Sequence, residues 1–190
     1  MLHHLRQGGR RLAVEMERLR LRSDSPARDA RAAVRRLPPE PTVTFLCLGN
    51  ICRSPLAERY FEARLSTAEC DCATVRSAGF IEKEGRSSPD AAVSVADELG
   101  VDLTDHRSRC VDADLLRESD LVLLMDARNY RHLKGKFPDE LDKACFLKSF
   151  AADGGFEIED PYSADEATFR RVYGEVTDSV DGLVDALEER

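Results

Sequence analysis

The chain has 190 residues, 42% of them apolar, which is enough for one domain with its own core plus a short extension. A net charge of −8 and a pI near 5.1 argue against bulk attraction to nucleic acid or to an acidic membrane. No apolar run approaches the roughly 18 residues of a membrane span, and the charged stretch "RLAVEMERLRLR" is unlike a secretory signal, so we expect a cytoplasmic protein.

Residues 1–41 differ from the rest of the chain in their charge. They contain 10 arginines, no lysine and 5 acidic residues, a balance of +5, whereas residues 42–190 have a balance of −13. Two helix-like runs precede the sequence "PPEP", in which the prolines prevent a continuous helix. We expect a basic, partly helical or disordered extension that ends in this linker. The second interpretation is a docking arm for an acidic partner or for the chain's own acidic domain.

Strand-like and helix-like segments alternate from residue 42 onward. In chain order, the pattern predicts a strand at 42–47, a helix at 54–66, a strand at 73–79, a helix at 88–101, strands at 119–126 and 143–150, and a helix at 163–190. The strands are short apolar runs, which is typical of a sheet buried on both faces. The sequence therefore predicts a three-layer α/β fold, in which helices cover both faces of a mostly parallel sheet.

The sequence "FLCLGNICRSPLAE" (45–58) lies where the first predicted strand turns into the first predicted helix. Folds of this class bind ligands at that edge of the sheet. Cys47 ends the strand and is followed by Gly49 and Asn50. Both of these residues tolerate the left-handed backbone of a tight loop whose N–H groups point inward around an anion. The chain then enters the positive end of a helix near Ser54.

A cysteine and an arginine at this place point to phosphate chemistry. Arg53 can offer two parallel N–H groups to phosphate oxygens. The inward N–H groups, the helix dipole and Arg53 all favour a thiolate at Cys47, which makes it a candidate nucleophile. The spacing C-x5-R alone is a weak signal, because it recurs from Cys70 to Arg76 without a glycine or a helix start. We interpret the second copy as chance.

A phosphatase that uses a thiolate also needs a proton donor for the leaving oxygen. Asp160 in "EIEDPYS" is the candidate, since it precedes a rigid proline in the loop before the last predicted helix. An Asp-Pro pair is also a common turn, so the sequence alone leaves a purely structural role open.

Five stretches together resemble the low molecular weight protein tyrosine phosphatase family over residues 42–188: "VTFLCLGNICRSPLAE", "RSAGF", "DHRSR", "SDLVLLMD" and "DPY". The resemblance implies a Rossmann-like fold with a four-stranded parallel sheet. It also implies hydrolysis of phosphotyrosine in proteins through a cysteinyl-phosphate intermediate, without a metal or organic cofactor. By this resemblance Cys47 is the nucleophile and Arg53 clamps the phosphate. Asp160 protonates the tyrosyl oxygen and then activates water as a base.

The same resemblance assigns the surrounding residues. Substrate binding would fall to Leu48, Gly49, Asn50, Ile51, Cys52, Ser54 and Tyr162. Ser77 and His106 match positions that support the loop by hydrogen bonds. Cys52 matches a cysteine that forms a reversible disulfide with the nucleophile and protects it from over-oxidation. The alternative for Cys52 is the role of a small buried apolar residue.

Two departures from the family pattern concern the substrate pocket. Glu82 or Lys83 falls where the family has an aromatic or bulky apolar wall, with Phe80 or Ile81 as candidates to replace it. A serine follows Tyr162 where several members have a second tyrosine. Both departures bear on substrate selectivity rather than on the chemistry.

Other functions stay open at this point. A protein-arginine phosphatase of the family usually has threonine in place of Ile51, so the isoleucine favours phosphotyrosine. An arsenate reductase of this fold needs two further cysteines in a mobile segment, where only Cys110 lies, while Cys145 is interpreted as strand core. A non-catalytic phosphate-binding protein is expected to lose the nucleophile or the acid. A zinc module would need Cys47, Cys52, Cys70 and Cys72, whose spacings are poor matches to zinc sites.

Overall fold

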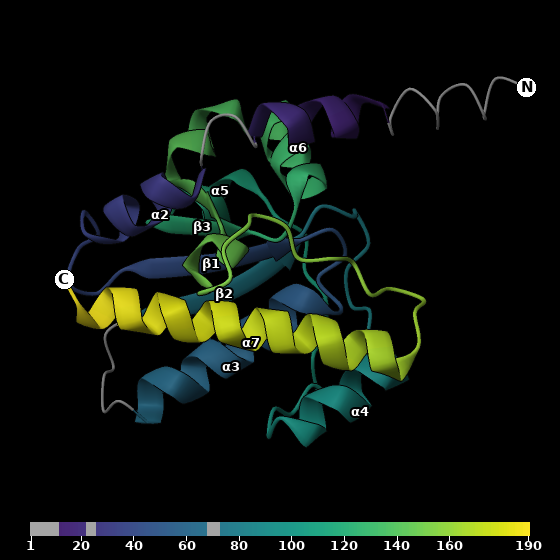
Figure 1. The fold of residues 1–190 in the computed structure, drawn as a ribbon. Helices are drawn as coiled ribbons and strands as arrows, with labels where there is room; N and C mark the ends of the chain where they lie inside the picture. Colours follow the sequence, from purple (N-terminus) through teal and green to yellow (C-terminus); the bar gives the residue numbers. More distant parts are fainter. Residues whose placement is uncertain (1–11, 22–25, 68–72) are drawn as a thin grey trace, which may run out of the picture.

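The computed structural model describes residues 12–21, 26–67 and 73–190 of the chain. At its centre lies a parallel four-stranded sheet in the order β2-β1-β3-β4 (Figure 1). The strands are β1 (Thr42–Cys47), β2 (Thr74–Gly79), β3 (Leu121–Leu124) and β4 (Ala144–Phe146). The predicted α/β fold with a four-stranded parallel sheet is confirmed.

Helices cover both faces of the sheet. They are α2 (Pro26–Val34), α3 (Arg53–Thr67), α4 (Asp90–Glu98), α5 (Ala113–Arg117), α6 (Ala127–Lys136) and α7 (Glu166–Glu188), with the 3-10 helices η1 (Pro138–Lys143) and η2 (Leu147–Phe150). α3, α4 and α7 pack on one face, and α5 and α6 pack on the other (Figure 1). The molecule therefore has the three layers that the sequence predicts.

The central strand β1 contributes to two cores. Phe45 packs with α3 and α7, and its ring meets Phe61 edge-on with 5.7 Å between ring centroids. The next residue, Leu46, faces the opposite core under α5 and α6. Successive side chains of a strand point to opposite faces, so a strand buried on both sides needs an unbroken apolar run. This requirement explains the sequence "VTFLC".

The fourth strand is shorter than the predicted 143–150. Only Ala144–Phe146 pairs with β3, and the chain then turns into η2. η2 packs closely against α7, since a Cβ on Gly182 would lie only 2.1 Å from Phe150 O. The apolar residues after Phe146 are therefore buried against a helix instead of in the sheet.

The pattern analysis missed α5 and α6 on the second face. α5 has only five residues, and α6 has the polar sequence "ARNYRHLKGK", so neither gives a helical apolar period. α6 begins after Asp126, whose Oδ1 accepts a hydrogen bond from Asn129 N at 2.8 Å. The last helix begins at Glu166 instead of 163, because Asp165 caps it in the same way.

The N-terminal segment also packs against the sheet domain. Residues 12–21 form a helix that lies beside α6 (Figure 1). Its Glu17 pairs with Lys134 of α6 at 3.2 Å, and Leu21 is buried in the core under α5 and α6. On the other face of the sheet, α2 buries Val34 in the core that α3, α4 and α7 cover. None of the helices in the described parts of the chain is long and apolar enough to cross a membrane.

Candidate active site

The predicted site residues gather at the edge of the sheet where the parallel strands end. Cys47 is the last residue of β1, and residues 48–52 connect it to α3. Gly79 ends β2, and Asp126 follows β3. We refer to the connection as the 47–54 loop. It is the strand-to-helix turn that the sequence predicts as a ligand site.

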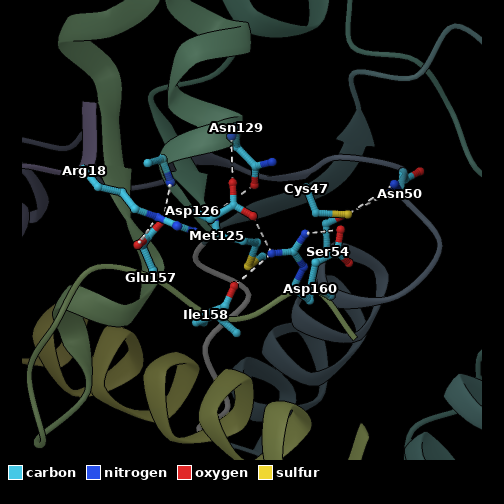
Figure 2. Close-up of polar contacts among 12 residues, drawn as sticks. Arg18, Cys47, Asn50, Ser54, Met125, Asp126, Asn129, Glu157, Ile158 and Asp160 are labelled. Atoms are coloured by element: carbon cyan, nitrogen blue, oxygen red, sulfur yellow. Dashed lines mark hydrogen bonds and ion pairs between the residues drawn. The ribbon is translucent and has the colours of Figure 1, made fainter. Parts of the chain in front are cut away.

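Cys47 lies inside the 47–54 loop and is 2% exposed. Its Sγ accepts hydrogen bonds from Asn50 N at 3.2 Å and from Ser54 Oγ at 3.1 Å. Figure 2 shows these two residues next to the sulfur. Hydrogen bonds to a charged acceptor are stronger than those to a neutral one, so both donors stabilise the thiolate relative to the thiol.

Asn50 fixes the shape of the loop. It has the left-handed backbone predicted for it, with φ 52°. Its Nδ2 donates to Ser54 Oγ at 3.0 Å and to Ser77 Oγ at 2.8 Å, while its Oδ1 accepts from Arg109 N at 2.9 Å. Gly49 does not adopt positive φ, contrary to the expectation. A Cβ at this position would lie 3.4 Å from Ile51, an ordinary van der Waals contact, so steric room does not require glycine here either.

Ser77 and His106 both contact Asn50. Ser77 Oγ receives the Asn50 amide and donates in turn to Glu58 Oε2 at 2.7 Å. His106 Nε2 lies 2.7 Å from Asn50 O, and because a carbonyl only accepts, Nε2 carries the proton. Burial lowers the pKa of His106, so the ring is neutral near pH 7 and acts as a fixed donor. Glu58, one helical turn after Ser54, was missed by sequence reasoning.

The end of β2 packs directly on the loop. A Cβ on Gly79 would lie 2.7 Å from Asn50 N, a distance that real side chains do not reach, so only glycine fits. The following residues Phe80 and Ile81 donate their N–H groups to Leu48 O at 2.9 and 3.1 Å. The "SAG" stretch is therefore part of the loop's support.

Arg53 is the first residue of α3 and is 1% exposed. Its Nη1 donates to Asp126 Oδ2 at 2.7 Å and to Ile158 O at 2.9 Å. Burial alone would lower the pKa of Arg53, but the carboxylates of Asp126 and Asp160 outweigh burial and raise it. The guanidinium is thus charged, and Asp126 and Ile158 hold it through Nη1.

The other side of the Arg53 guanidinium is left without hydrogen bonds. Nε and Nη2 are buried and have no hydrogen-bond acceptor among the described residues. Nη2 makes only an ion-pair contact with Asp160 Oδ2, at 3.1 Å. Leaving a buried donor unsatisfied costs about 1–3 kcal/mol. Two such donors on one planar group match the two oxygens of a phosphate.

Asp160 lies between Arg53 and solvent. Its side chain is 32% exposed, and the buried Pro161 follows it. Tyr162, two residues after the acid, is 61% exposed. The structure thus brings the predicted nucleophile, arginine and acid to one place and leaves the Tyr162 side chain exposed to solvent.

Cys52 and Ile51 complete the loop. Cys52 is a free, buried thiol, and burial first, with a contribution from Cys47, raises the pKa of Cys52. The hydroxyl of Tyr173 donates to Cys52 O at 3.2 Å and ties the loop to α7. Ile51 is 8% exposed and therefore offers only a small apolar surface.

Of the two residues after β2 that are expected as candidates for the apolar pocket wall, only Ile81 is exposed. Phe80 turns into the core and stacks on His132, with 5.3 Å between ring centroids, so it is not a wall residue. Ile81 is 39% exposed and is the apolar side chain that this segment presents. Glu82 instead pairs with Lys136 of α6, at 2.5 Å.

Cys110 and Cys145 are not brought into the site. Cys110 is half-buried, and its Sγ donates to Ile81 O at 3.1 Å. Cys145 is buried in β4, as predicted. Cys70 and Cys72 lie outside the described residues, so the interpretations that involve them are not tested by the structure. In the described parts of the chain, no three His, Cys, Asp or Glu side chains are grouped as a metal site.

Sequence reasoning missed the two groups that accept hydrogen bonds from Arg53 Nη1, which are Asp126 and Ile158 O. Asp126 ends the third predicted strand, and a polar residue at the carboxyl end of a parallel strand is a signal for a site residue. Ile158 acts through its backbone carbonyl, for which no side-chain pattern exists.

Comparisons with known proteins agree with this geometry. The sequence profile of the low molecular weight phosphotyrosine protein phosphatase family matches residues 42–190. Low molecular weight protein-tyrosine phosphatase A of Mycobacterium tuberculosis is 35% identical, over 78% of this chain and 92% of that protein. The crystal structure of the Erwinia amylovora tyrosine phosphatase AmsI matches with a TM-score of 0.70 at 32% identity, over 78% of this chain and 93% of that one. The YwlE arginine phosphatase of Geobacillus stearothermophilus matches with a TM-score of 0.71 at 28% identity, over 78% and 94%.

Proposed function

Because the chain belongs to the low molecular weight phosphotyrosine protein phosphatase family, and is therefore a cysteine-dependent phosphatase, we propose that Cys47, Arg53 and Asp160 hydrolyse phosphotyrosine in protein substrates. One observation supports the proposal most strongly. The buried guanidinium of Arg53 has two nitrogens, Nε and Nη2, without a hydrogen-bond acceptor among the described residues, beside a sulfur that receives two hydrogen bonds. That pairing binds a phosphate and presents a nucleophile to its phosphorus.

In the first step, Arg53 Nε and Nη2 bind two phosphate oxygens. The Cys47 thiolate attacks the phosphorus on the side opposite the tyrosyl oxygen. The S–P bond forms while the bond from phosphorus to the tyrosyl oxygen breaks. Phosphate binding displaces the Asp160 carboxylate from Arg53, and the freed carboxylate takes up a proton from solvent. Asp160 gives this proton to the tyrosyl oxygen, and tyrosine leaves neutral.

In the second step, water replaces tyrosine. The Asp160 carboxylate takes a proton from the water as its oxygen attacks the phosphorus. The P–S bond breaks, its electron pair returns to Cys47, and phosphate leaves. Asn50 N and Ser54 Oγ stabilise the returning thiolate, so it is a good leaving group as well as a good nucleophile.

The loop and the rim would bind the rest of the substrate. Backbone N–H groups of the 47–54 loop surround the phosphate, with Leu48, Gly49 and Ile51 contributing main chain and a small apolar surface. Tyr162 at the rim offers its ring to the flat phenol. Ser54 Oγ donates a hydrogen bond to Cys47 Sγ and accepts one from Asn50 Nδ2. The residue that shapes the loop is therefore linked to the nucleophile through Ser54.

Cys52 would protect the nucleophile from oxidation. Burial raises the pKa of Cys52 and keeps it a thiol, whereas the Cys47 sulfur receives two hydrogen bonds in the loop, so Cys47 is the sulfur that we expect an oxidant to attack first. A sulfenic acid on Cys47 would then condense with the Cys52 thiol, releasing water and forming a disulfide that thiols can reduce.

The second candidate substrate is phosphoarginine. The likeness to the Geobacillus stearothermophilus arginine phosphatase is as good in fold as the likeness to the tyrosine phosphatase, so backbone shape does not separate the two substrates. Ile51 separates them by size, because a branched apolar side chain takes the room that a guanidinium needs. This argument favours phosphotyrosine.

The acid role of Asp160 has a specific kinetic signature. Asp160→Asn should lower kcat/KM on aryl phosphates with poor leaving groups by about 10²–10³-fold, the usual contribution of a general acid. Good leaving groups depart without a proton, so their turnover should change by less than about fivefold. The measurement is kcat/KM across aryl phosphates whose phenols span several pKa values.

Glu159→Gln is the matched control, because the neighbouring Glu159 is exposed and pairs with Arg171 of α7 instead of the site. It should keep the wild-type dependence on the leaving group. An equal loss on all leaving groups in Asp160→Asn would argue against proton donation and for a purely structural Asp-Pro turn.

A further inference from the structure

Glu157 lies three residues before Asp160, the proposed acid, and contacts both α6 and the N-terminal helix. Its Oε1 accepts a hydrogen bond from Ala127 N, at the first turn of α6, at 3.0 Å. The same carboxylate pairs with Arg18, whose Nε lies 3.0 Å from Oε1 and 2.9 Å from Oε2. Figure 2 shows Arg18 reaching Glu157 beside the Asp126 and Ile158 contacts of the site.

The segment that carries Asp160 is anchored on both sides of Glu157. Phe156 and Ile158 are buried, and Glu159 pairs with Arg171 of α7. Ile158 N donates to Met125 O at 2.7 Å, and Ile158 O accepts from Arg53. The Glu157 side chain adds a polar contact from this segment to α6 and to the N-terminal helix. A shift of Glu157 would therefore displace Ile158 and Asp160 with it.

Arg18 comes from outside the family's part of the chain. The family profile begins at residue 42, whereas Arg18 belongs to the helix at 12–21. That helix has its own anchors, since Leu21 is buried under α5 and α6 and Glu17 pairs with Lys134. Because the helix is anchored, the position of Arg18 is fixed by the helix. The ion pair therefore limits the movement of the Glu157 side chain.

We propose that Arg18 and Glu157 are positioning residues for the general acid, through which the N-terminal helix holds the 157–160 segment so that Asp160 faces the leaving oxygen. This proposal rests on the proposed function. It gives the basic N-terminal segment a role in the chain's own catalysis. It requires no acidic partner, because the acidic group is Glu157 of the same chain.

The contact should affect the proton-transfer step more than phosphate binding. The Arg18 and Glu157 side chains are 37% and 21% exposed, so their pair is partly screened by water and its effect is modest. We expect about a threefold to tenfold loss in kcat/KM on aryl phosphates with poor leaving groups when the pair is broken. With good leaving groups the loss should stay within about twofold.

The test compares Arg18→Gln, Glu157→Gln and the double variant of the full chain on both kinds of aryl phosphate. The readout is kcat/KM on poor leaving groups divided by kcat/KM on good leaving groups within each variant, a ratio that does not depend on how much of the enzyme is correctly folded. Each single variant should lower this ratio. The double variant should lower it no further, since both substitutions break the same contact. Arg18→Lys should restore part of the ratio, because lysine still pairs with a carboxylate.

Arg31→Gln is the matched control. It removes an ion pair between α2 of the N-terminal segment and Glu189 at the end of α7, at 3.2 Å, without touching Glu157 or the helix at 12–21, so it should leave the ratio unchanged. A wild-type ratio in Arg18→Gln, or an equal change in Arg31→Gln, would overturn the proposal. Failure of the proposed function itself looks different, because wild-type enzyme would then show no turnover that depends on Cys47.

Discussion

Cys47→Ser should lower the turnover of aryl phosphates by on the order of 10⁴-fold or more. A serine hydroxyl is hardly ionised at neutral pH, so the donors that stabilise a thiolate have no anion to stabilise. The side chain is nearly isosteric, and Asn50 N and Ser54 Oγ can donate to an oxygen as they do to Sγ. The loop should therefore keep its shape and still bind inorganic phosphate. Steady-state kinetics and calorimetric phosphate titration measure the two properties separately.

Cys110→Ser is the control for this change. Cys110 is a half-buried thiol outside the 47–54 loop, and serine can keep its hydrogen bond to Ile81 O. It should retain wild-type turnover, which would also count against a relay of thiols as in an arsenate reductase. Turnover within tenfold of wild type in Cys47→Ser would mean that another group attacks the phosphorus.

Arg53→Lys should lower kcat/KM by about 10³-fold although it keeps the charge. Lysine has one nitrogen, so it cannot hold Asp126 and Ile158 and also present two N–H groups to a phosphate. A lysine bound to Asp126 leaves the phosphate without its clamp. A lysine bound to phosphate leaves a buried carboxylate with a weaker partner. Kinetics with an aryl phosphate, and competition by inorganic phosphate, measure the loss.

Arg59→Lys is the matched control on the same helix. The Arg59 side chain is 51% exposed and pairs only weakly with Glu62, at 3.5 Å, so the exchange should leave kcat/KM unchanged. If Arg53→Lys kept both turnover and phosphate affinity within about threefold of wild type, the unpartnered N–H groups would not be the phosphate clamp.

The layers of the fold could be predicted because burial on both faces leaves a direct mark on the sequence. "FLC" and "LVLLM" are short apolar runs, as strands between two helical layers require. α6 leaves no such mark, since only one side of its polar sequence is buried and its start depends on the Asp126 cap. The close approach of η2 to α7 at Gly182 is a backbone contact between distant parts of the chain, which no local pattern contains.

The site was predictable where neighbouring residues act together. Cys47, Asn50, Arg53 and Ser54 share one turn, so their spacing, together with the strand before it and the helix start after it, indicates an anion site. Contacts that join distant parts of the chain had no such signal. Asp126 reaches Arg53 across the sheet edge, and Arg18 reaches Glu157 from the N-terminal helix. Both pairings follow from tertiary packing, which determines partners that spacing cannot show.

The substrate comparison tests the central claim most directly. Steady-state hydrolysis should be measured without added metal on three peptides that carry phosphotyrosine, phosphoarginine or phosphoserine, with Cys47→Ser as the blank. The account predicts turnover that favours phosphotyrosine and is lost in Cys47→Ser, because the loop binds the phosphate while Ile51 and Tyr162 admit a flat ring. A preference for phosphoarginine, or hydrolysis that persists in Cys47→Ser, would contradict it.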